Sequence, residues 1–396
     1  MKVVFAHTDF RIYWPARLNT LREFLAQKGI SLNIIEIAGK GSPYSFAEFT
    51  NVDSLYWHIL FKDQRMEKIP PEKANKALRR KLDEIMPDIV FAGAIAFPSG
   101  AAAVLWAGEN KKKVVIFDDA RLLDTPRPGF VNYVKKSIYK YVDAILTSSS
   151  TMNETYKFFG FNDEQIFHGV TVVDNSFWQN GVEEKNDLLP EKYFLTVSRQ
   201  IPKKNLMYLL KAYNNYTRSV PDPIGLVLVG EGPERAALED FVKESQLQKV
   251  LFLPFLAQKE LRKIYRNASC FILPSLFGET WGLTVNEAMA SGLPVIVSDK
   301  AGCASTLVRN NINGFVFSPD DTEELTVILI NLHNMSENIV KQMGKKSQEI
   351  ISNWGLEKFC SGVIDALEFV SSHDQKRPGG ITRLLVRIWK GRYRPT

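Results

Sequence analysis

The chain of 396 residues carries a formal net charge of +6, and 45% of its residues are hydrophobic and 24% charged. These are the proportions of an ordinary soluble globular protein, and the length favours two domains over one. Seven basic residues and no acidic residue lie within 376–396, and without them the net charge is −1, which argues against a broad nucleic-acid-binding surface.

The first half of the chain alternates apolar runs with helical patterns. Strands are predicted at VVFAH, LNIIEIA, IVFAG, VVIFDD and AILTSS, with helices between them. No basic segment precedes the first strand, so no secretory signal is expected. Residues 89–108 are uncharged and long enough for a membrane span, but Pro98 and Gly100 interrupt them. A buried strand, a turn and a helix are therefore favoured over a span.

The second half repeats this plan more clearly. Strands are predicted at 193–198, 225–230, 250–255, 270–275 and 294–299, separated by helical patterns. Single helices between strands indicate right-handed βαβ units and a parallel sheet covered on both faces.

Two doubly wound, Rossmann-like α/β domains facing across a cleft are therefore expected. We place the first at 1–178 and the second at 179–354, joined through the polar stretch 173–193. Residues 355–396 are expected to form C-terminal helices that cross back, followed by a basic tail. Ligands of such sheets bind beyond the carboxyl ends of the strands.

Two carboxylates stand in the stretch FGETWGLTVNEAMASGLPVIVSD, whose other residues are mostly those of a protein interior. Glu279 is expected in the loop after the strand 270–275, and Glu287 on the inward face of a helix that ends at Gly292. A carboxylate removed from water needs a partner or a task. Its two oxygens can accept paired hydrogen bonds from sugar hydroxyls.

The start of the same helix favours phosphate. Gly282 leaves backbone N–H groups exposed there, at Leu283 and Thr284, and such groups bind phosphate oxygens. A nucleotide sugar carries both hydroxyls and a pyrophosphate, so it would account for both features.

The setting of Glu279 and Glu287, eight positions apart, resembles the signature of the family-4 retaining glycosyltransferases with a GT-B fold. Four other segments are similar to that family in order and spacing: VSRQIPKKNLMYLLKAY, LVLVGEGPERAALE, FLPFLAQKELRKIYRNASCFILPS and NNINGFVFSPDDTEEL. The resemblance is strong over about 193–325 and loose over the first half.

The resemblance implies a role for each matched residue. Glu279 would hold a hydroxyl of the donor sugar, and Glu287 the ribose hydroxyls. Arg199 and Lys204 would neutralise the diphosphate leaving group, although Lys203 could replace Lys204 as the ligand. The remaining donor-site positions are Gly230, Gly232, Gly282, Leu283 and Thr284.

The reaction implied is a hexosyl transfer with retention, from a UDP-sugar or GDP-sugar to a sugar or lipid-linked glycan. The setting implied is cell-envelope polysaccharide or lipopolysaccharide synthesis in the cytoplasm. Retention would proceed on one face, the leaving phosphate taking the acceptor's proton. No metal or other cofactor is expected, because two fixed cations stabilise the leaving oxygens. The chain also lacks a DxD at a strand end, a zinc spacing among its five histidines, and a CxxC among its three cysteines.

The first half departs from the family pattern. HTDFRIYWPARLN has no glycine where many members carry a Gly-Gly loop, so Arg11 or Arg17 would supply charge there, unless Arg17 lies on a solvated helix face. His7 would be either a satisfied side chain or a base.

A second departure follows the strand VVIFDD. Where many members have a histidine, this chain has Asp118 and Asp119, followed by Asp124 and Arg127, and the run is similar to that of a bacterial subgroup. Asp119 is expected on the acceptor side of the catalytic face. A loop cap or a salt bridge is its alternative.

The tail forms a separate pattern. Apolar residues recur at helical spacing, namely Ile381, Leu384, Leu385 and Ile388, while Arg383, Arg387 and Lys390 fall on other faces. Such a helix suits an anionic membrane surface, which predicts a peripheral enzyme on the inner face of the membrane. The alternative is a helix that packs back on the first domain.

Three other functions stay open. One is a different GT-B nucleotide-sugar enzyme, such as an epimerase, and another is a non-catalytic sugar-nucleotide-binding partner. A dinucleotide-dependent oxidoreductase is weaker, because VGEGPERAALE lacks the full GxGxxG pattern and the acidic residue that should follow it.

Overall fold

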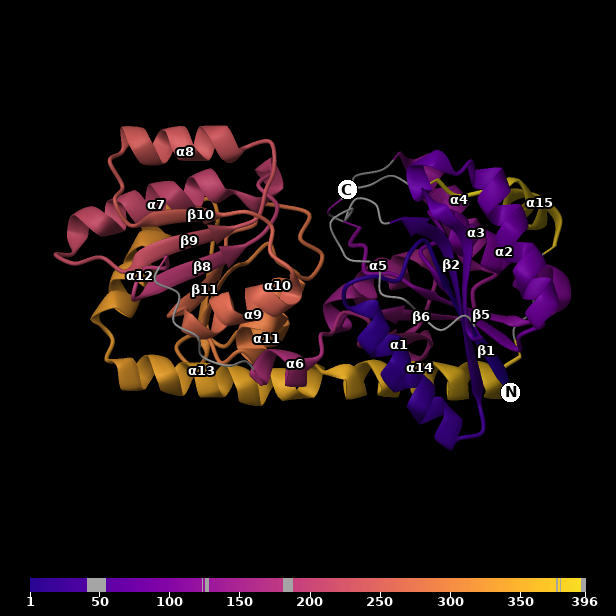
Figure 1. Cartoon of the computed structure of the whole chain (residues 1–396). Helices are drawn as coiled ribbons and strands as arrows, with labels where there is room; N and C mark the ends of the chain where they lie inside the picture. Colours follow the sequence, from indigo (N-terminus) through magenta and orange to yellow (C-terminus); the bar gives the residue numbers. More distant parts are fainter. Residues whose placement is uncertain are drawn as a thin grey trace. The chain divides into compact units, whose positions relative to one another are not determined.

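The computed structural model describes residues 1–40, 55–122, 124, 128–180, 188–374, 377 and 379–392. The chain divides into two compact units (Figure 1). Unit 1 comprises Met1–Val172 and Leu356–Thr396, and unit 2 comprises Val173–Gly355. Within the described ranges, no helix is both long and apolar enough to span a bilayer.

The described part of unit 1 contains a seven-stranded sheet in which every neighbouring pair is parallel. In spatial order the strands are β3 (Trp57–Arg65), β2 (Ser31–Lys40), β1 (Lys2–His7), β4 (Ile89–Gly93), β5 (Lys113–Phe117), β6 (Ala144–Thr147) and β7 (Ile166–His168). The five predicted strands are present. The two edge strands of this sheet, β3 and β7, were not predicted.

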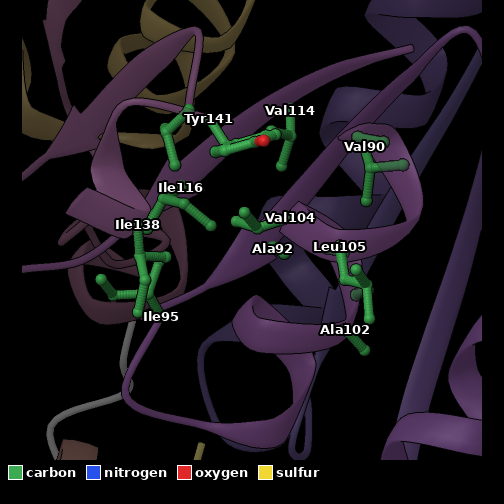
Figure 2. Close-up of a cluster of buried hydrophobic side chains, with 14 of the residues drawn as sticks. Val90, Ala92, Ile95, Ala102, Val104, Leu105, Val114, Ile116, Ile138 and Tyr141 are labelled. Carbon is green, nitrogen blue, oxygen red and sulfur yellow. The ribbon is translucent and has the colours of Figure 1, made fainter. Parts of the chain in front are cut away.

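Helices cover both faces of this sheet. On one face, side chains of β4 and β5 pack with those of α3 (Pro98–Asn110) and α4 (Gly129–Tyr139) (Figure 2). On the other face, Val3 and Phe5 pack with α1 (Trp14–Gln27) and α14 (Leu356–Ser372). The remaining helical segments are η1 (Met66–Lys68), α2 (Pro71–Ile85), η2 (Ser150–Met152), α5 (Asn153–Phe159), η3 (Asp163–Gln165) and α15 (Gly380–Ile388).

The apolar stretch 89–108 forms β4 and α3, and so a strand and a helix rather than a span. The turn lies slightly earlier than predicted. Pro98 is the first residue of α3 rather than part of the turn, because its fixed φ and missing N–H suit the first helical position.

The described part of unit 2 contains a six-stranded parallel sheet. In spatial order the strands are β10 (Val250–Leu253), β9 (Gly225–Val229), β8 (Tyr193–Val197), β11 (Cys270–Leu273), β12 (Val295–Ser298) and β13 (Gly314–Phe317). The first five correspond to the predicted strands, and the edge strand β13 was not predicted. Two doubly wound Rossmann-like units, as the sequence predicted, are confirmed.

The helices of unit 2 mostly connect successive strands. They are α6 (Asn175–Gln179), η4 (Pro202–Lys204), α7 (Leu206–Ser219), α8 (Arg235–Glu244), α9 (Gln258–Asn267), α10 (Leu283–Ala290), α11 (Ala304–Leu307), α12 (Thr322–Asn334), α13 (Glu337–Ile351) and η5 (Ser352–Trp354). Part of the stretch predicted to join the domains is ordered structure, because Trp178 of α6 is buried against Tyr265. Residues 181–187 of that stretch lie outside the described residues.

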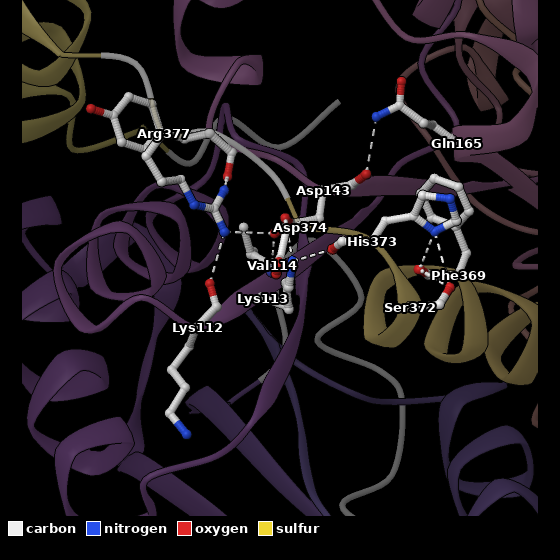
Figure 3. A network of polar contacts seen from close by, with 11 residues as sticks. Lys112, Lys113, Val114, Asp143, Gln165, Phe369, Ser372, His373, Asp374 and Arg377 are labelled. Carbon is white, nitrogen blue, oxygen red and sulfur yellow. Dashed lines mark hydrogen bonds and ion pairs between the residues drawn. The ribbon is translucent and has the colours of Figure 1, made fainter.

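The C-terminal segment docks on unit 1, as the alternative reading of the tail predicted. Val386 of α15 is buried in the core, and the Trp389 indole donates a hydrogen bond of 2.6 Å to the Ile95 carbonyl. Upstream, Arg377 donates hydrogen bonds of 2.8 Å to the carboxylate of Asp143 and to the Lys112 carbonyl (Figure 3). The segment is therefore held at both ends of α15.

Candidate active site

The candidate site lies between β8 and β11, where the order of strands in the unit 2 sheet reverses. We call such a position the reversal point of a sheet. From β8 the chain proceeds to β9 and β10 on one side, and from β11 to β12 and β13 on the other. The loops that follow β8 and β11 therefore leave neighbouring strands at the same edge, which is where ligands of such sheets bind. The two loops are joined by a hydrogen bond of 2.9 Å from Leu276 N–H to the Lys203 carbonyl.

Lys204 and Glu279 form an ion pair between these two loops. The Lys204 ammonium donates to Glu279 Oε2, and the Ser275 hydroxyl donates to the same oxygen over 3.0 Å. Both side chains are mostly buried, with 13% and 12% of their surface exposed. Burial opposes ionisation, but the charge and hydrogen bond of Lys204, with smaller contributions from Lys203 and Ser275, lower the pKa of Glu279. Glu279 is therefore a carboxylate at neutral pH.

This pairing bears on two predicted roles. The sequence assigned Lys204 to the diphosphate and Glu279 to the donor sugar, as separate contacts. The structure brings the two side chains together. Lys203 instead places its ammonium 3.5 Å from the Gly278 carbonyl. Of the two lysines, Lys204 is thus the one bound directly to the carboxylate.

Arg199 lies on the same loop as Lys204. It is the second residue after β8 and is half-buried. The preceding residue, Ser198, is fixed by a hydrogen bond of 3.0 Å from its N–H to the Val229 carbonyl, so the loop leaves the sheet in a defined direction.

Glu287 faces inward from α10, as predicted. It is only 1% exposed, and the Tyr265 hydroxyl donates a hydrogen bond of 2.9 Å to its Oε2. The same Tyr265 hydroxyl oxygen also lies 3.3 Å from the Thr284 carbonyl oxygen. Sequence reasoning missed Tyr265, because within α9 it follows the apolar spacing of Leu261 and Ile264 and looks like a core residue.

Gly230 and Gly232 allow the loops after β8 and β9 to approach closely. A Cβ at Gly230 would lie 2.1 Å from the Ser198 carbonyl oxygen, and one at Gly232 would lie 2.2 Å from that of Gln200. Gln200 N–H also donates to the Glu231 carbonyl over 2.8 Å. The glycines thus set the position of the loop that carries Arg199.

The start of α10 is shaped by Gly282, whose φ of 106° lies in the left-handed region. A Cβ there would also meet Leu273 at 2.8 Å. Within the described part of the chain no side chain caps the helix, and its first residues, Leu283 and Thr284, are half-buried. The predicted phosphate-facing positions therefore stand at an N-terminus without a side-chain cap.

In unit 1, Asp119 lies just after β5 and is half-buried near Arg17. Arg17 is buried, and its Nε donates to the Val172 carbonyl over 2.9 Å. Burial lowers the pKa of Arg17 to about 10, against the opposing effects of Tyr13 and Asp119. The alternative of a solvated helix face for Arg17 is therefore wrong, because the side chain points into the protein.

The other acidic residues after β5 have local partners. Asp118 Oδ1 accepts a hydrogen bond of 3.2 Å from Ala120 N–H, which makes Asp118 the loop cap. Asp124 accepts two hydrogen bonds from Arg121, of 2.6 and 2.9 Å. Arg127 lies outside the described residues.

Arg11, the other candidate cation of this half, is also buried. Its guanidinium donates to the Gly39 carbonyl, and its Nε lies 4.0 Å from Glu36 Oε1. It therefore takes part in a buried polar cluster at the end of β1.

Several known proteins resemble this chain in sequence. Residues 181–350 match the family model described as glycosyl transferases group 1. The chain is 27% identical over 199 residues to an uncharacterized glycosyltransferase of Methanocaldococcus jannaschii, a match that covers 48% of this chain and 50% of that protein. It is 28% identical over 214 residues to the O-antigen chain mannosyltransferase RfbU of Salmonella typhimurium, covering 53% and 56%. The chain spans about half the length of the curated relatives it matches.

Solved structures resemble the fold over almost the whole chain. The HepE protein of Anabaena, in complex with UDP and glucose, superposes with a TM-score of 0.72 at 16% identity, covering 93% of this chain and 99% of that one. At that identity the likeness shows the fold. Residues 181–350 therefore belong to the group 1 glycosyltransferases, in a chain with the GT-B fold of the family-4-like enzymes.

Proposed function

We propose that this protein is a retaining, metal-independent hexosyltransferase that uses a nucleoside-diphosphate sugar. The observation that supports this most is the Lys204–Glu279 pair at the reversal point of the unit 2 sheet, with Arg199 on the same loop. The two cations, Arg199 and Lys204, would neutralise a diphosphate, and the carboxylate of Glu279 would accept a hydrogen bond from a sugar hydroxyl.

The pairing of Lys204 with Glu279 is compatible with donor binding. An ammonium group has three N–H donors, so Lys204 can contact a phosphate oxygen while it keeps its hydrogen bond to the carboxylate. Glu279 would thereby connect the sugar hydroxyl to the leaving group. Glu287, held by Tyr265, would accept hydrogen bonds from the ribose.

In the proposed reaction the bond between the anomeric carbon and the phosphate oxygen breaks. Negative charge then develops on the diphosphate, where Arg199 and Lys204 stabilise it. The acceptor hydroxyl adds to the same face of the sugar, and its proton passes to the departing phosphate. Asp119, next to Arg17, would face the acceptor.

Similarity supports the donor and the pathway that we propose. The Anabaena structure holds UDP, which favours a UDP-sugar over a GDP-sugar. The Salmonella relative is an O-antigen chain mannosyltransferase, which supports a sugar or lipid-linked glycan acceptor in polysaccharide or lipopolysaccharide synthesis.

We also propose that α15 contacts an anionic membrane from the cytoplasmic side. Val386 faces the core, whereas Ile381, Leu384 and Ile388 are well exposed. Phe130 and Tyr133 of the neighbouring α4 are exposed as well. Together with Arg383 and Arg387, these residues offer a bilayer both apolar and basic groups.

Calorimetric titration with UDP and GDP, followed by a donor screen with product analysis, tests the enzymatic proposal. Binding of one nucleotide and formation of a glycoside with the donor's anomeric configuration are expected. An inverted product would remove the retaining assignment. Sugar-nucleotide isomerisation without an acceptor would favour the epimerase alternative, and binding without turnover would favour the non-catalytic one.

A further inference from the structure

Unit 1 has its own reversal point, between β1 and β4. From β1 the chain proceeds to β2 and β3, and from β4 to β5, β6 and β7. His7 is the last residue of β1, and Gly93 is the last residue of β4. The ligand-binding position of a doubly wound sheet is thus occupied in unit 1 by a histidine beside a glycine.

Aromatic rings surround His7 on several sides. Their centroids lie between 5.2 and 6.1 Å from that of the imidazole, and they belong to Phe10, Trp14, Phe97 and Phe117. Gly93 makes room for the imidazole, because a Cβ at that position would lie 2.1 Å from His7 Nδ1. The position therefore accepts the histidine only with a glycine opposite.

The hydrogen bonds of His7 are incomplete. Nδ1 is buried and has no hydrogen-bond partner among the residues that the structure describes, although the residue as a whole is only half-buried. Burial lowers the pKa of His7 to about 4, so the imidazole is neutral at pH 7. A neutral imidazole carries one N–H. Since Nδ1 has no acceptor, the proton belongs on Nε2.

Packing alone does not account for this residue. A phenylalanine would fill the same space among aromatic rings without leaving a buried polar atom unsatisfied, which costs about 1–3 kcal/mol. The sequence interpretation of His7 as a satisfied side chain is therefore wrong. A histidine kept at a reversal point despite this cost indicates a function for its other nitrogen, Nε2.

We propose that His7 binds the acceptor sugar, its Nε2–H donating to a hydroxyl while the apolar face of the sugar lies against the half-buried rings of Trp14 and Phe97. Apolar rings with one well-placed donor are the usual composition of a small-molecule site. This inference rests on the proposed function and adds the acceptor subsite to it.

Trp14 connects this subsite to Asp119. Its ring lies 5.1 Å from that of Phe117, and the Arg17 guanidinium stands 5.0 Å from the Trp14 centroid. Arg17 in turn interacts electrostatically with Asp119. An acceptor on Trp14 would therefore be close to the acidic residue that we place on the acceptor side.

Nuclear magnetic resonance of the imidazole nitrogens tests the contact directly. The chain has five histidines, and the signals missing in His7→Phe identify those of His7. Probes are methyl and octyl glycosides of glucose, galactose, mannose and N-acetylglucosamine, as both anomers. We expect a neutral His7 protonated at Nε2, and a shift of the Nε2 signal with at least one glycoside. A His7 protonated at Nδ1, or unmoved by every glycoside, would overturn the proposal.

Two variants separate binding from packing. His7→Phe keeps an aromatic ring but removes the donor, so glycoside affinity should fall about ten-fold while Tm stays equal or rises. His168→Gln is the matched control, because the His168 ring already has a hydrogen bond of 2.8 Å with Asn153. This variant should leave glycoside affinity unchanged. Native affinity in His7→Phe would refute the subsite. Failure of the native chain to bind UDP and GDP would instead refute the proposed function, and nucleotide titration is independent of the His7 measurements.

Discussion

The ammonium of Lys204 donates a hydrogen bond to the carboxylate of Glu279, although 75 positions separate the two residues in the chain. Each side chain is mostly buried, so each charge depends on the other. Removal of one partner leaves an uncompensated charge at the site, which usually costs more than the pair contributes. Variants of either residue therefore report on stability as well as on ligand binding.

Replacement of Arg199 or Lys204 with alanine should weaken binding of the nucleoside diphosphate about ten- to a hundred-fold, because each removes a charge-assisted contact to phosphate. Lys204→Ala should also lower Tm, since it removes the cation that is paired with the buried Glu279 carboxylate. Calorimetric titration and thermal melting measure the two effects. Lys211→Ala, on the exposed side of α7, is the control. Unchanged diphosphate affinity in both variants would contradict the donor-site assignment.

Glu279→Gln should lose turnover more than diphosphate affinity, and Glu287→Gln should do the reverse. The first residue is assigned to the transferred sugar and the second to the ribose, and a free nucleoside diphosphate contains only the ribose. An amide oxygen can still accept the Tyr265 hydrogen bond, so the second variant should fold. If both variants weaken binding of the free nucleoside diphosphate equally, the division of roles is wrong.

Glu36→Gln should change the pH dependence of stability. Burial raises the pKa of Glu36 from 4.5 to about 7, against hydrogen bonds from the Trp57 indole and Phe10 N–H. Between these two pKa values the folded state keeps a proton on Glu36 that the unfolded state has released. The contribution of Glu36 to stability is therefore full below about pH 4.5 and is lost as pH rises through about 7.

Chemical denaturation between pH 5 and pH 8 measures this effect. Relative to the native chain, Glu36→Gln should gain stability as pH rises, because an amide does not ionise. A constant difference between the two proteins across this range would show that Glu36 does not titrate there.

Substitution of Ile381, Leu384 and Ile388 with serine should abolish sedimentation with anionic vesicles and leave Tm unchanged, because these side chains are exposed. Phosphatidylglycerol vesicles supply the anionic surface and phosphatidylcholine vesicles the neutral control. Release by salt is also expected, since each basic residue near the surface contributes roughly 1 kcal/mol that salt screens.

Truncation after residue 375 is a different experiment. It removes the buried Val386, the Trp389–Ile95 hydrogen bond and the Arg377–Asp143 pair, so Tm should fall. Persistent vesicle binding by the triple serine variant, with binding lost only on truncation, would place the membrane contact elsewhere in the tail.

Local patterns predicted the strands and helices well wherever a long apolar run was buried. Of the edge strands of the two described sheets, β10 was predicted from its apolar run, whereas β3, β7 and β13 were not, because each of these is short or partly polar and its pairing comes from distant residues. The sequence singled out Glu279 as a carboxylate in an apolar stretch and Lys204 by resemblance to a family, and the structure brings the two side chains together.

Contacts between residues far apart in the chain could not be predicted from the sequence. The bond between Lys204 and Glu279, the Tyr265 hydroxyl on Glu287 and the burial of Arg17 all depend on which loops the sheet order brings together. For His7, the signal was the neighbouring Gly93, which lies 86 positions away in the sequence and whose importance appears only once β1 and β4 are paired.

The placement of α14 in unit 1 has a consequence for the order in which the protein is made. Phe359 and Val363 of this helix pack with Val3 and Phe5, so the part of this sheet face that α1 does not cover stays exposed until residues 356–372 have left the ribosome. Unit 2 is continuous in sequence and can complete its core earlier. During synthesis the nascent first unit would thus expose apolar surface for the time needed to translate the whole second unit, which makes it the natural client of a chaperone.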